Sequence, residues 1–175
     1  MKKNIFAIVG SASKNSSNLK LIEHIAELTQ EEFDFTIFDS LAELPHFNPE
    51  LSVENTPPEI LNFRETILKA DGLLICTPEY IFSIPSGLKN AIEWCVSTTV
   101  FSGKPLGMIT ASASGLKAHE ELQLIMRTLE TKFNECTLLL IQGVKGKFEN
   151  DNIVDAKTVN DLNTFIKGFK DLLED

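Results

Sequence analysis

The segment from residue 10 to residue 18, GSASKNSSN, gathers small hydroxyl and amide side chains directly after a short apolar run. When a strand turns through such residues into a helix, unpaired backbone N–H groups at the positive helix end favour an anion. The segment therefore predicts a phosphate site, although Ser16 or Ser17 could do no more than cap the helix. The side chains able to bond phosphate oxygens are those of Ser11, Ser13, Ser16 and Asn18.

The glycine patterns of other nucleotide-binding proteins are absent from the sequence. It contains neither G-x-G-x-x-G, the fingerprint of dinucleotide folds, nor the P-loop pattern G-x-x-x-x-G-K-[ST]. Asp39, at the end of a predicted strand, is therefore a weak candidate for a ribose-binding acid. A monophosphate without a metal fits segment 10–18 better than a triphosphate does.

A second segment, from residue 77 to residue 94, reads TPEYIFSIPSGLKNAIEW. Pro78 stiffens the exit from the preceding apolar run, and Pro85 suits the start of a helix. Between the two prolines, backbone groups are free to meet the edge of a planar heterocycle, while the Tyr-Ile-Phe run at 80–82 offers apolar surface. The alternative is a surface loop whose aromatic side chains pack inward.

A third segment, TASASGLKA at residues 110–118, is rich in small residues. A run of this kind lets the backbone approach a ring closely. The alternative is a plain turn in which Ser114 caps the following helix.

Five apolar runs alternate with helical patterns along the chain. The runs lack the alternation of half-exposed strands, which predicts a parallel sheet covered on both faces. We expect one α/β domain over residues 1–175, with three layers and a five-stranded parallel sheet in the flavodoxin-like order 2-1-3-4-5, so that ligands bind beyond the carboxyl ends of the strands. The expected strands are 5–9, 35–38, 73–77, 106–110 and 138–141, and the helices begin near residues 19, 57, 86, 115 and 156, the fourth reaching about Phe133.

Composition and charge exclude several classes of function. The net charge of −9 argues against sequence-independent nucleic-acid binding, which needs a basic face. No stretch approaches the roughly 20 apolar residues of a membrane-spanning helix, and the N-terminal apolar run is too short for a signal sequence. Three cysteines without metal-like spacing, Cys76 expected to be buried and inert, fit a reduced, cytoplasmic protein.

The three histidines, His24, His46 and His119, are scattered without metal-binding spacing, so no metal site is expected. His119, after the third segment, and His46 are minor candidates for contact with a ligand. No pattern of residues predicts a side-chain nucleophile or a catalytic acid–base pair.

The second segment resembles the P-E-Y-N-x-S-x-P-x-x-L-K-N-A-[IL]-[DE]-W signature of the NAD(P)H-dependent FMN reductases, which include quinone, azo-dye and chromate reductases. The first segment is similar to the family pattern G-S-x-R-x-x-S-x-N, and the resemblance extends over about residues 4–172. The matching residues are Gly10, Ser11, Ser16 and Asn18 in the first segment, and Pro78, Glu79, Tyr80, Ser83, Pro85, Leu88, Lys89, Asn90, Ala91, Ile92, Glu93 and Trp94 in the second.

The resemblance implies an FMN-containing oxidoreductase that takes hydride from NADPH or NADH and reduces a small acceptor, such as a quinone, an azo compound, a metal oxyanion or free flavin. It also implies a homodimer or homotetramer with the active site at a subunit interface. Binding residues carried over by the resemblance are Ser11, Ser13, Ser16 and Asn18 for the phosphate, Pro78, Glu79, Tyr80 and Ile81 for the ring, and Ser112 and Gly115 for its far edge.

Two positions depart from the family pattern. Ser13 stands where the family has an arginine, which removes a bidentate phosphate partner, and Ile81 stands where it has an asparagine. The adjacent Lys14 could supply charge, or it could be an ordinary solvated lysine. Two other functions stay open: a flavodoxin-like carrier that binds FMN without using a nicotinamide, and an α/β protein without flavin.

Overall fold

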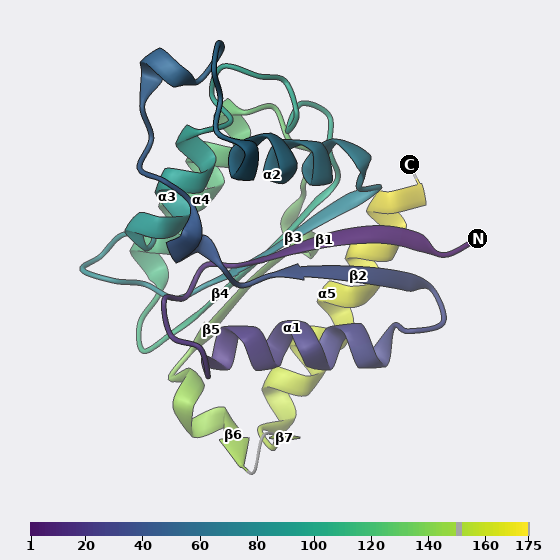
Figure 1. Cartoon of the computed structure of the whole chain (residues 1–175). Coiled ribbons are helices and arrows are strands. Elements are labelled where there is room, and N and C mark those ends of the chain that lie inside the picture. Colours follow the sequence, from purple (N-terminus) through teal and green to yellow (C-terminus); the bar gives the residue numbers. More distant parts are fainter. Residues whose placement is uncertain (150–151, 175) are drawn as a thin grey trace.

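The central sheet has five parallel strands in the order β2-β1-β3-β4-β5, which confirms the predicted topology (Figure 1). The computed structural model describes residues 1–149 and 152–174. Each observed strand contains its predicted counterpart and extends it by one or two residues at one end. The strands are β1 (Lys3–Val9), β2 (Phe33–Phe38), β3 (Gly72–Thr77), β4 (Leu106–Ser112) and β5 (Leu138–Gln142).

Helices cover both faces of the sheet, as the lack of alternation in the strands predicts. α1 (Ser17–Leu28) and α5 (Ala156–Glu174) pack on one face, whereas α2 (Pro58–Lys69), α3 (Ser86–Glu93) and α4 (Leu116–Thr128) pack on the other (Figure 1). All six residues of β3 are buried. A strand with apolar layers on both sides has no solvent face, so its sequence is apolar throughout.

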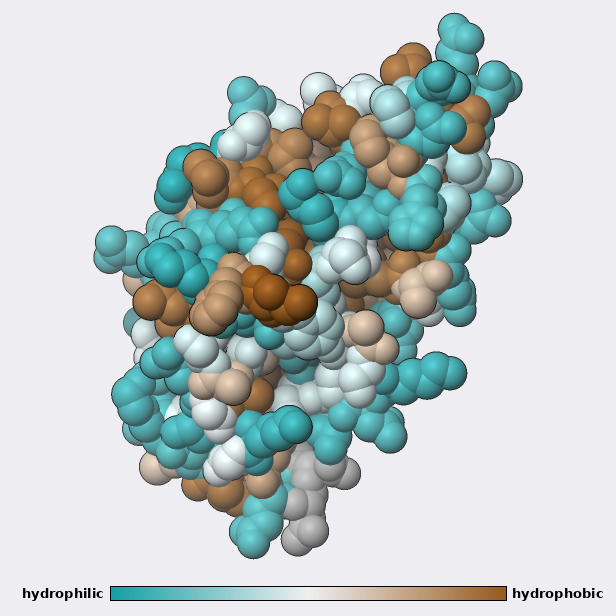
Figure 2. All heavy atoms as spheres, turned by 90° about the vertical axis from the view of Figure 1, so that its left-hand side faces the viewer, coloured by the Kyte–Doolittle hydropathy of each residue, from teal (hydrophilic) through white to brown (hydrophobic). Residues whose placement is uncertain are grey.

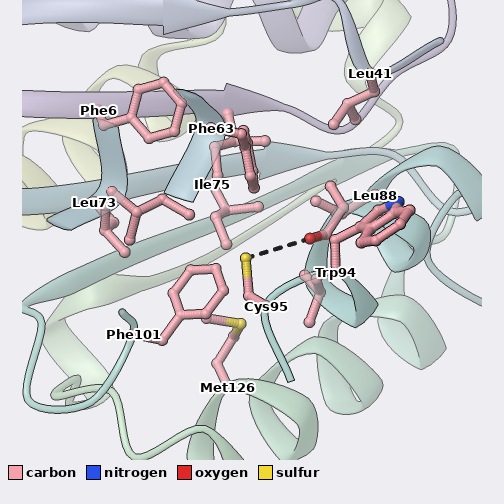
Figure 3. Packing of buried hydrophobic residues seen from close by; sticks show 14 of the residues in the cluster. Phe6, Leu41, Phe63, Leu73, Ile75, Leu88, Trp94, Cys95, Phe101 and Met126 are labelled. Carbon is pink, nitrogen blue, oxygen red and sulfur yellow. Dashed lines mark hydrogen bonds between the residues drawn. The ribbon is translucent and has the colours of Figure 1, made fainter. Parts of the chain in front are cut away.

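The core between the sheet and helices α2–α4 contains a buried arginine. Arg64 is 8% exposed, and its Nε and Nη2 atoms donate to the carbonyl oxygens of Trp94 and Ser52 at 2.9 Å each. Trp94 is fully buried beside Leu88 and Cys95 (Figure 3), and its indole N–H donates to the carbonyl oxygen of Pro45 at 2.7 Å. The guanidinium thus donates hydrogen bonds to buried carbonyl oxygens of two separate loops, which would otherwise lack a partner.

Helix α4 ends at Thr128, so the prediction that it continues to about Phe133 is wrong. Glu130 takes a left-handed conformation with φ of 60°, which reverses the chain. The carbonyl oxygen of Lys132 then accepts from the N–H of Leu106, at the start of β4. The sheet therefore competes for these residues and stops a helix that the local pattern would extend.

Among the described residues, four short 3₁₀ helices and an antiparallel pair of short strands, β6 (Phe148–Glu149) and β7 (Asn152–Ile153), were not predicted. The 3₁₀ helices are Leu41–Glu43, Pro49–Leu51, Glu135–Thr137 and Val144–Lys147. Within residues 1–149 and 152–174, no helix combines the length and apolar character needed to cross a bilayer.

Replacing Arg64 by methionine is expected to lower the free energy of unfolding by about 3 kcal/mol, because buried carbonyl groups lose charged donors. Urea denaturation of the wild type and the variant measures this loss. The matched control is Arg127→Met, at an exposed arginine whose guanidinium lies over the ring of Phe133. This variant should lower the free energy of unfolding by under about 1 kcal/mol. Equal losses for the two variants would contradict the structural role assigned to Arg64.

Candidate functional site

A cavity of about 560 Å³ lies at the carboxyl edge of the sheet, where the exits of β1, β3, β4 and β5 meet. Figure 2 views this side of the molecule and shows apolar patches set among hydrophilic side chains. Eight of the ten residues that the family resemblance singles out line the cavity, whereas Ile81 and Gly115 do not. The eight are Ser11, Ser13, Ser16, Asn18, Pro78, Glu79, Tyr80 and Ser112.

The start of α1 forms the hydroxyl-rich end of the cavity. Ser16 caps the helix, because its Oγ accepts from the N–H of Leu19 at 3.1 Å. Capping uses the oxygen as an acceptor and leaves the hydroxyl hydrogen free to donate to a ligand. The first turn of α1 holds no acidic residue, so nothing there competes with an anion for the positive helix end.

Asn18 lies at the same end of the cavity but is only 3% exposed. Its Nδ2 donates to the carbonyl oxygen of Ala111 at 3.3 Å, and its Oδ1 accepts from the thiol of Cys76 at 3.3 Å. The side chain therefore ties the start of α1 to β3 and β4. Both polar atoms of its amide already bond to the protein, so the side chain of Asn18 holds the loops together.

Glu79 connects the second and third segments. Its two carboxylate oxygens accept from the N–H groups of Gly115 at 3.2 Å and Ala118 at 3.0 Å. These groups belong to the first turn of α4, where a carboxylate is favoured. Gly115 precedes the helix with φ of +87°. Its hydrogen bond with Glu79 holds the turn after β4 against the exit of β3.

The tip of the second segment is a tight turn from Tyr80 to Ser83, closed by backbone hydrogen bonds of 2.9 and 3.1 Å. Ile81 and Phe82 both have left-handed conformations, with φ of 50° and 59°. The side chains of Ile81 and Phe82 are 95% and 76% exposed. The alternative in which Phe82 packs into the core is therefore wrong. Glu121 fixes the base of the turn, since its carboxylate accepts from the hydroxyl of Ser83 at 2.7 Å and the N–H of Ile84 at 2.9 Å.

One wall of the cavity comes from residues 143–145, which sequence reasoning missed. Gly143 follows β5 with φ of 63°, and its N–H donates to the carbonyl oxygen of Ala113 at 3.1 Å. The motifs of the sequence lie at the exits of the first, third and fourth strands, whereas residues 143–145, Gly-Val-Lys, match none. The signal available was the position of this segment directly after β5, at the carboxyl end of a parallel strand.

A second cavity, of about 510 Å³, adjoins the first and shares Ser11 and Tyr80 with it. Asp39 and His46 line this second cavity. His119 lines neither cavity. Its Nδ1 lies 2.9 Å from the hydroxyl of Thr110, and burial lowers the pKa of its imidazole.

The first cavity has the chemistry of a site for a planar ring that carries a phosphate. Hydroxyl groups and a helix N-terminus stand at one end, and small residues of the β4 exit leave room for a ring at the other. The volume lies within the range of small-molecule sites. Cys76 is fully buried, as expected, and burial raises the pKa of its thiol, which disfavours the reactive thiolate.

Comparisons with known proteins agree with this geometry. The model of the NADPH-dependent FMN reductase family matches residues 3–145. The chain is 31% identical to 2-hydroxy-1,4-benzoquinone reductase from Burkholderia sp., covering 95% of this chain and 93% of that protein. It is also 31% identical to NADPH:quinone oxidoreductase from Arabidopsis thaliana, over 88% and 83% of the two chains. A flavoenzyme NAD(P)H:(acceptor) oxidoreductase from Paracoccus denitrificans, FerB, superposes with a TM-score of 0.83 at 28% identity, covering 98% and 97%.

Replacing Ile81 by asparagine is expected to stabilise the fold by about 1 kcal/mol, because a β-branched residue is strained at positive φ and asparagine tolerates that region. Chemical denaturation measures the gain. The control is Val96→Asn, at an exposed apolar residue whose φ is not positive. If the Ile81 variant gains no more than the control, the turn is not strained.

Proposed function

Because the chain belongs to the NADPH-dependent FMN reductase family, we propose that it is a quinone reductase whose FMN occupies the cavity at the carboxyl edge of the sheet. Bound FMN supplies the redox chemistry, since its ring can accept hydride from NAD(P)H and pass two electrons to an acceptor. The net reaction converts NAD(P)H, a quinone and a proton into NAD(P)⁺ and a hydroquinone. The observation that carries the proposal is that one 560 Å³ cavity joins the start of α1 to the exits of β3 and β4.

In this proposal the phosphate lies at the start of α1. The hydroxyls of Ser11, Ser13 and Ser16 line that end of the cavity, and the N–H groups of the first helical turn have no carbonyl partner within the helix. The ring then lies between the backbone at 78–80 and the small residues at 111–113. These groups orient the ring, and no side chain of the protein needs to form a covalent bond.

A quinone is the acceptor that we propose. Ile81 and Phe82 present apolar surface beside the cavity, and a planar apolar acceptor can bury it. Two relatives named for quinones, at 31% identity, support the same class. Azo compounds, metal oxyanions and free flavin are the other acceptors that the family resemblance leaves open.

We also propose that the protein is cytoplasmic and forms a homodimer or homotetramer, as the family resemblance implies. Exposed apolar side chains of α4, Leu116 and Leu124, are available for a subunit contact. Light scattering of the purified protein tests the assembly, and a monomeric mass at micromolar concentration would contradict it.

The purified protein is expected to bind FMN stoichiometrically, to lose its flavin absorbance when NADPH or NADH is added without oxygen, and to recover it when 1,4-benzoquinone follows. Anaerobic absorbance spectroscopy measures all three steps, with azo dye and chromate as alternative acceptors. FMN binding without bleaching by either nicotinamide would favour the electron carrier. Absence of FMN binding would overturn the proposal in favour of a protein without flavin.

Replacing Ser16 by glycine is expected to weaken FMN binding about 5-fold, through loss of one hydrogen bond to the phosphate. Glycine is a tolerable N-cap, so stability should change by only a few tenths of a kcal/mol, and denaturation checks that the fold survives. Fluorescence titration with FMN and with riboflavin, which lacks the phosphate, measures the effect. Unchanged FMN affinity, or an equal loss for riboflavin, would contradict the assignment.

A further inference from the structure

The proposed phosphate site has little positive charge in its own loop. At neutral pH a phosphate monoester carries close to two negative charges, and this chain has a net charge of −9. Lys14 is the only cationic residue of segment 10–18, and it is exposed and absent from the cavity lining. Ser13, which does line the cavity, is neutral. Hydroxyls and the helix end therefore provide the anion's partners from this loop.

Among the described residues that line the cavity, Lys145 is the one with a cationic side chain. It comes from the wall after β5, far in sequence from the serine-rich loop. Glu79 is the one carboxylate in the same lining, and both of its oxygens already accept from backbone N–H groups of α4. The charge facing a bound anion is therefore set largely by Lys145.

The backbone around Lys145 is held on both sides. Gly143 donates to Ala113, Val144 is buried at 6% exposure, and the N–H of Gly146 donates back to the carbonyl oxygen of Gly143 at 3.0 Å. The nearby Lys147 has a partner, since its Nζ lies 3.0 Å from the carboxylate of Asp155. The ammonium group of Lys145 forms no ion pair or hydrogen bond with another residue of the ranges 1–149 and 152–174, so it is available to a ligand.

We propose that Lys145 binds the phosphate of FMN and supplies the charge that segment 10–18 lacks. The inference rests on the proposed location of FMN and adds a binding residue from a fourth loop. A lysine acts here as a mobile point charge, unlike the fixed bidentate fork of an arginine. Its contribution should therefore depend on salt and be specific for the phosphorylated form of the flavin.

The test is a fluorescence titration of flavin-free protein with FMN and with riboflavin, for the wild type and for Lys145→Gln, Lys145→Arg and Lys14→Gln. We expect Lys145→Gln to weaken FMN binding ~3- to 5-fold, the effect of one partly screened ion pair, and to leave riboflavin binding unchanged. Lys145→Arg should retain most of the affinity. Lys14→Gln is the matched control and should change FMN affinity less than 2-fold, a level that marks a solvated lysine.

Sodium chloride between 0.05 and 0.5 M, a range of ~10-fold, should weaken FMN binding to the wild type more than to Lys145→Gln. Thermal unfolding of the flavin-free variants should match the wild type, because the exposed side chain of Lys145 forms no ion pair or hydrogen bond in the part of the chain that the structure describes. An unchanged FMN affinity in Lys145→Gln, an equal loss for riboflavin, or a larger loss in Lys14→Gln would each overturn the inference. Failure of the wild type to bind FMN would instead refute the proposed function.

Discussion

Parallel pairing of the five strands is the constraint on which the rest of this structure depends. Because neighbouring strands run in the same direction, their carboxyl ends meet at one edge, and each connection must cross a face of the sheet. The layers between the sheet and the helices are largely apolar, with Arg64 as a buried exception. Polar segments that begin 100 residues apart in sequence, at 10–18 and 110–118, therefore come together around one cavity.

Meeting at one edge of the sheet would not by itself fix the positions of these loops. Hydrogen bonds between the loops make them a defined site. Asn18 joins the start of α1 to the end of β4, Glu79 joins the exit of β3 to the start of α4, and the N–H of Gly143 joins the exit of β5 to Ala113. Of the side chains that make these links, Asn18 is buried and Glu79 is half-buried, where hydrogen bonds are least exchanged with water. A cofactor bound in this cavity would meet groups whose positions are already fixed.

The fold could be predicted from the sequence because its signals are local and repeated. Five apolar runs, breakers such as Pro58 and Pro85, and the helical periodicity between them gave the layers and the strand order. Details that depend on tertiary contacts could not be predicted in this way. Helix α4 stops at Thr128 because Lys132 pairs with the start of β4, and the buried position of Arg64 depends on carbonyl groups of two distant loops.

The residues of the candidate site likewise fall into those that local sequence signals predict and those that only tertiary contacts reveal. Hydroxyl residues at a strand-to-helix turn are a local signal, and they led to the serines that line the cavity. The wall at residues 143–145 has no such signal. A lysine after a strand resembles any surface lysine until the sheet brings it beside the serine-rich loop. Strain at Ile81 was equally hidden, since the left-handed turn depends on Glu121 from α4.

The long motif at residues 78–94 also shows that a matched residue and a ligand-binding residue are different things. Asn90 accepts from the N–H of Phe47 and donates to the carbonyl oxygen of Pro45, and the indole of Trp94 donates to that same oxygen. These side chains hold the segment that carries His46, one wall of the second cavity. The motif thus locates the site through residues that support its loops, whereas the exposed pair Ile81 and Phe82 is free to vary with the acceptor. Chemical specificity in this chain is therefore expected to lie at loop tips, and the scaffold beneath them to tolerate little change.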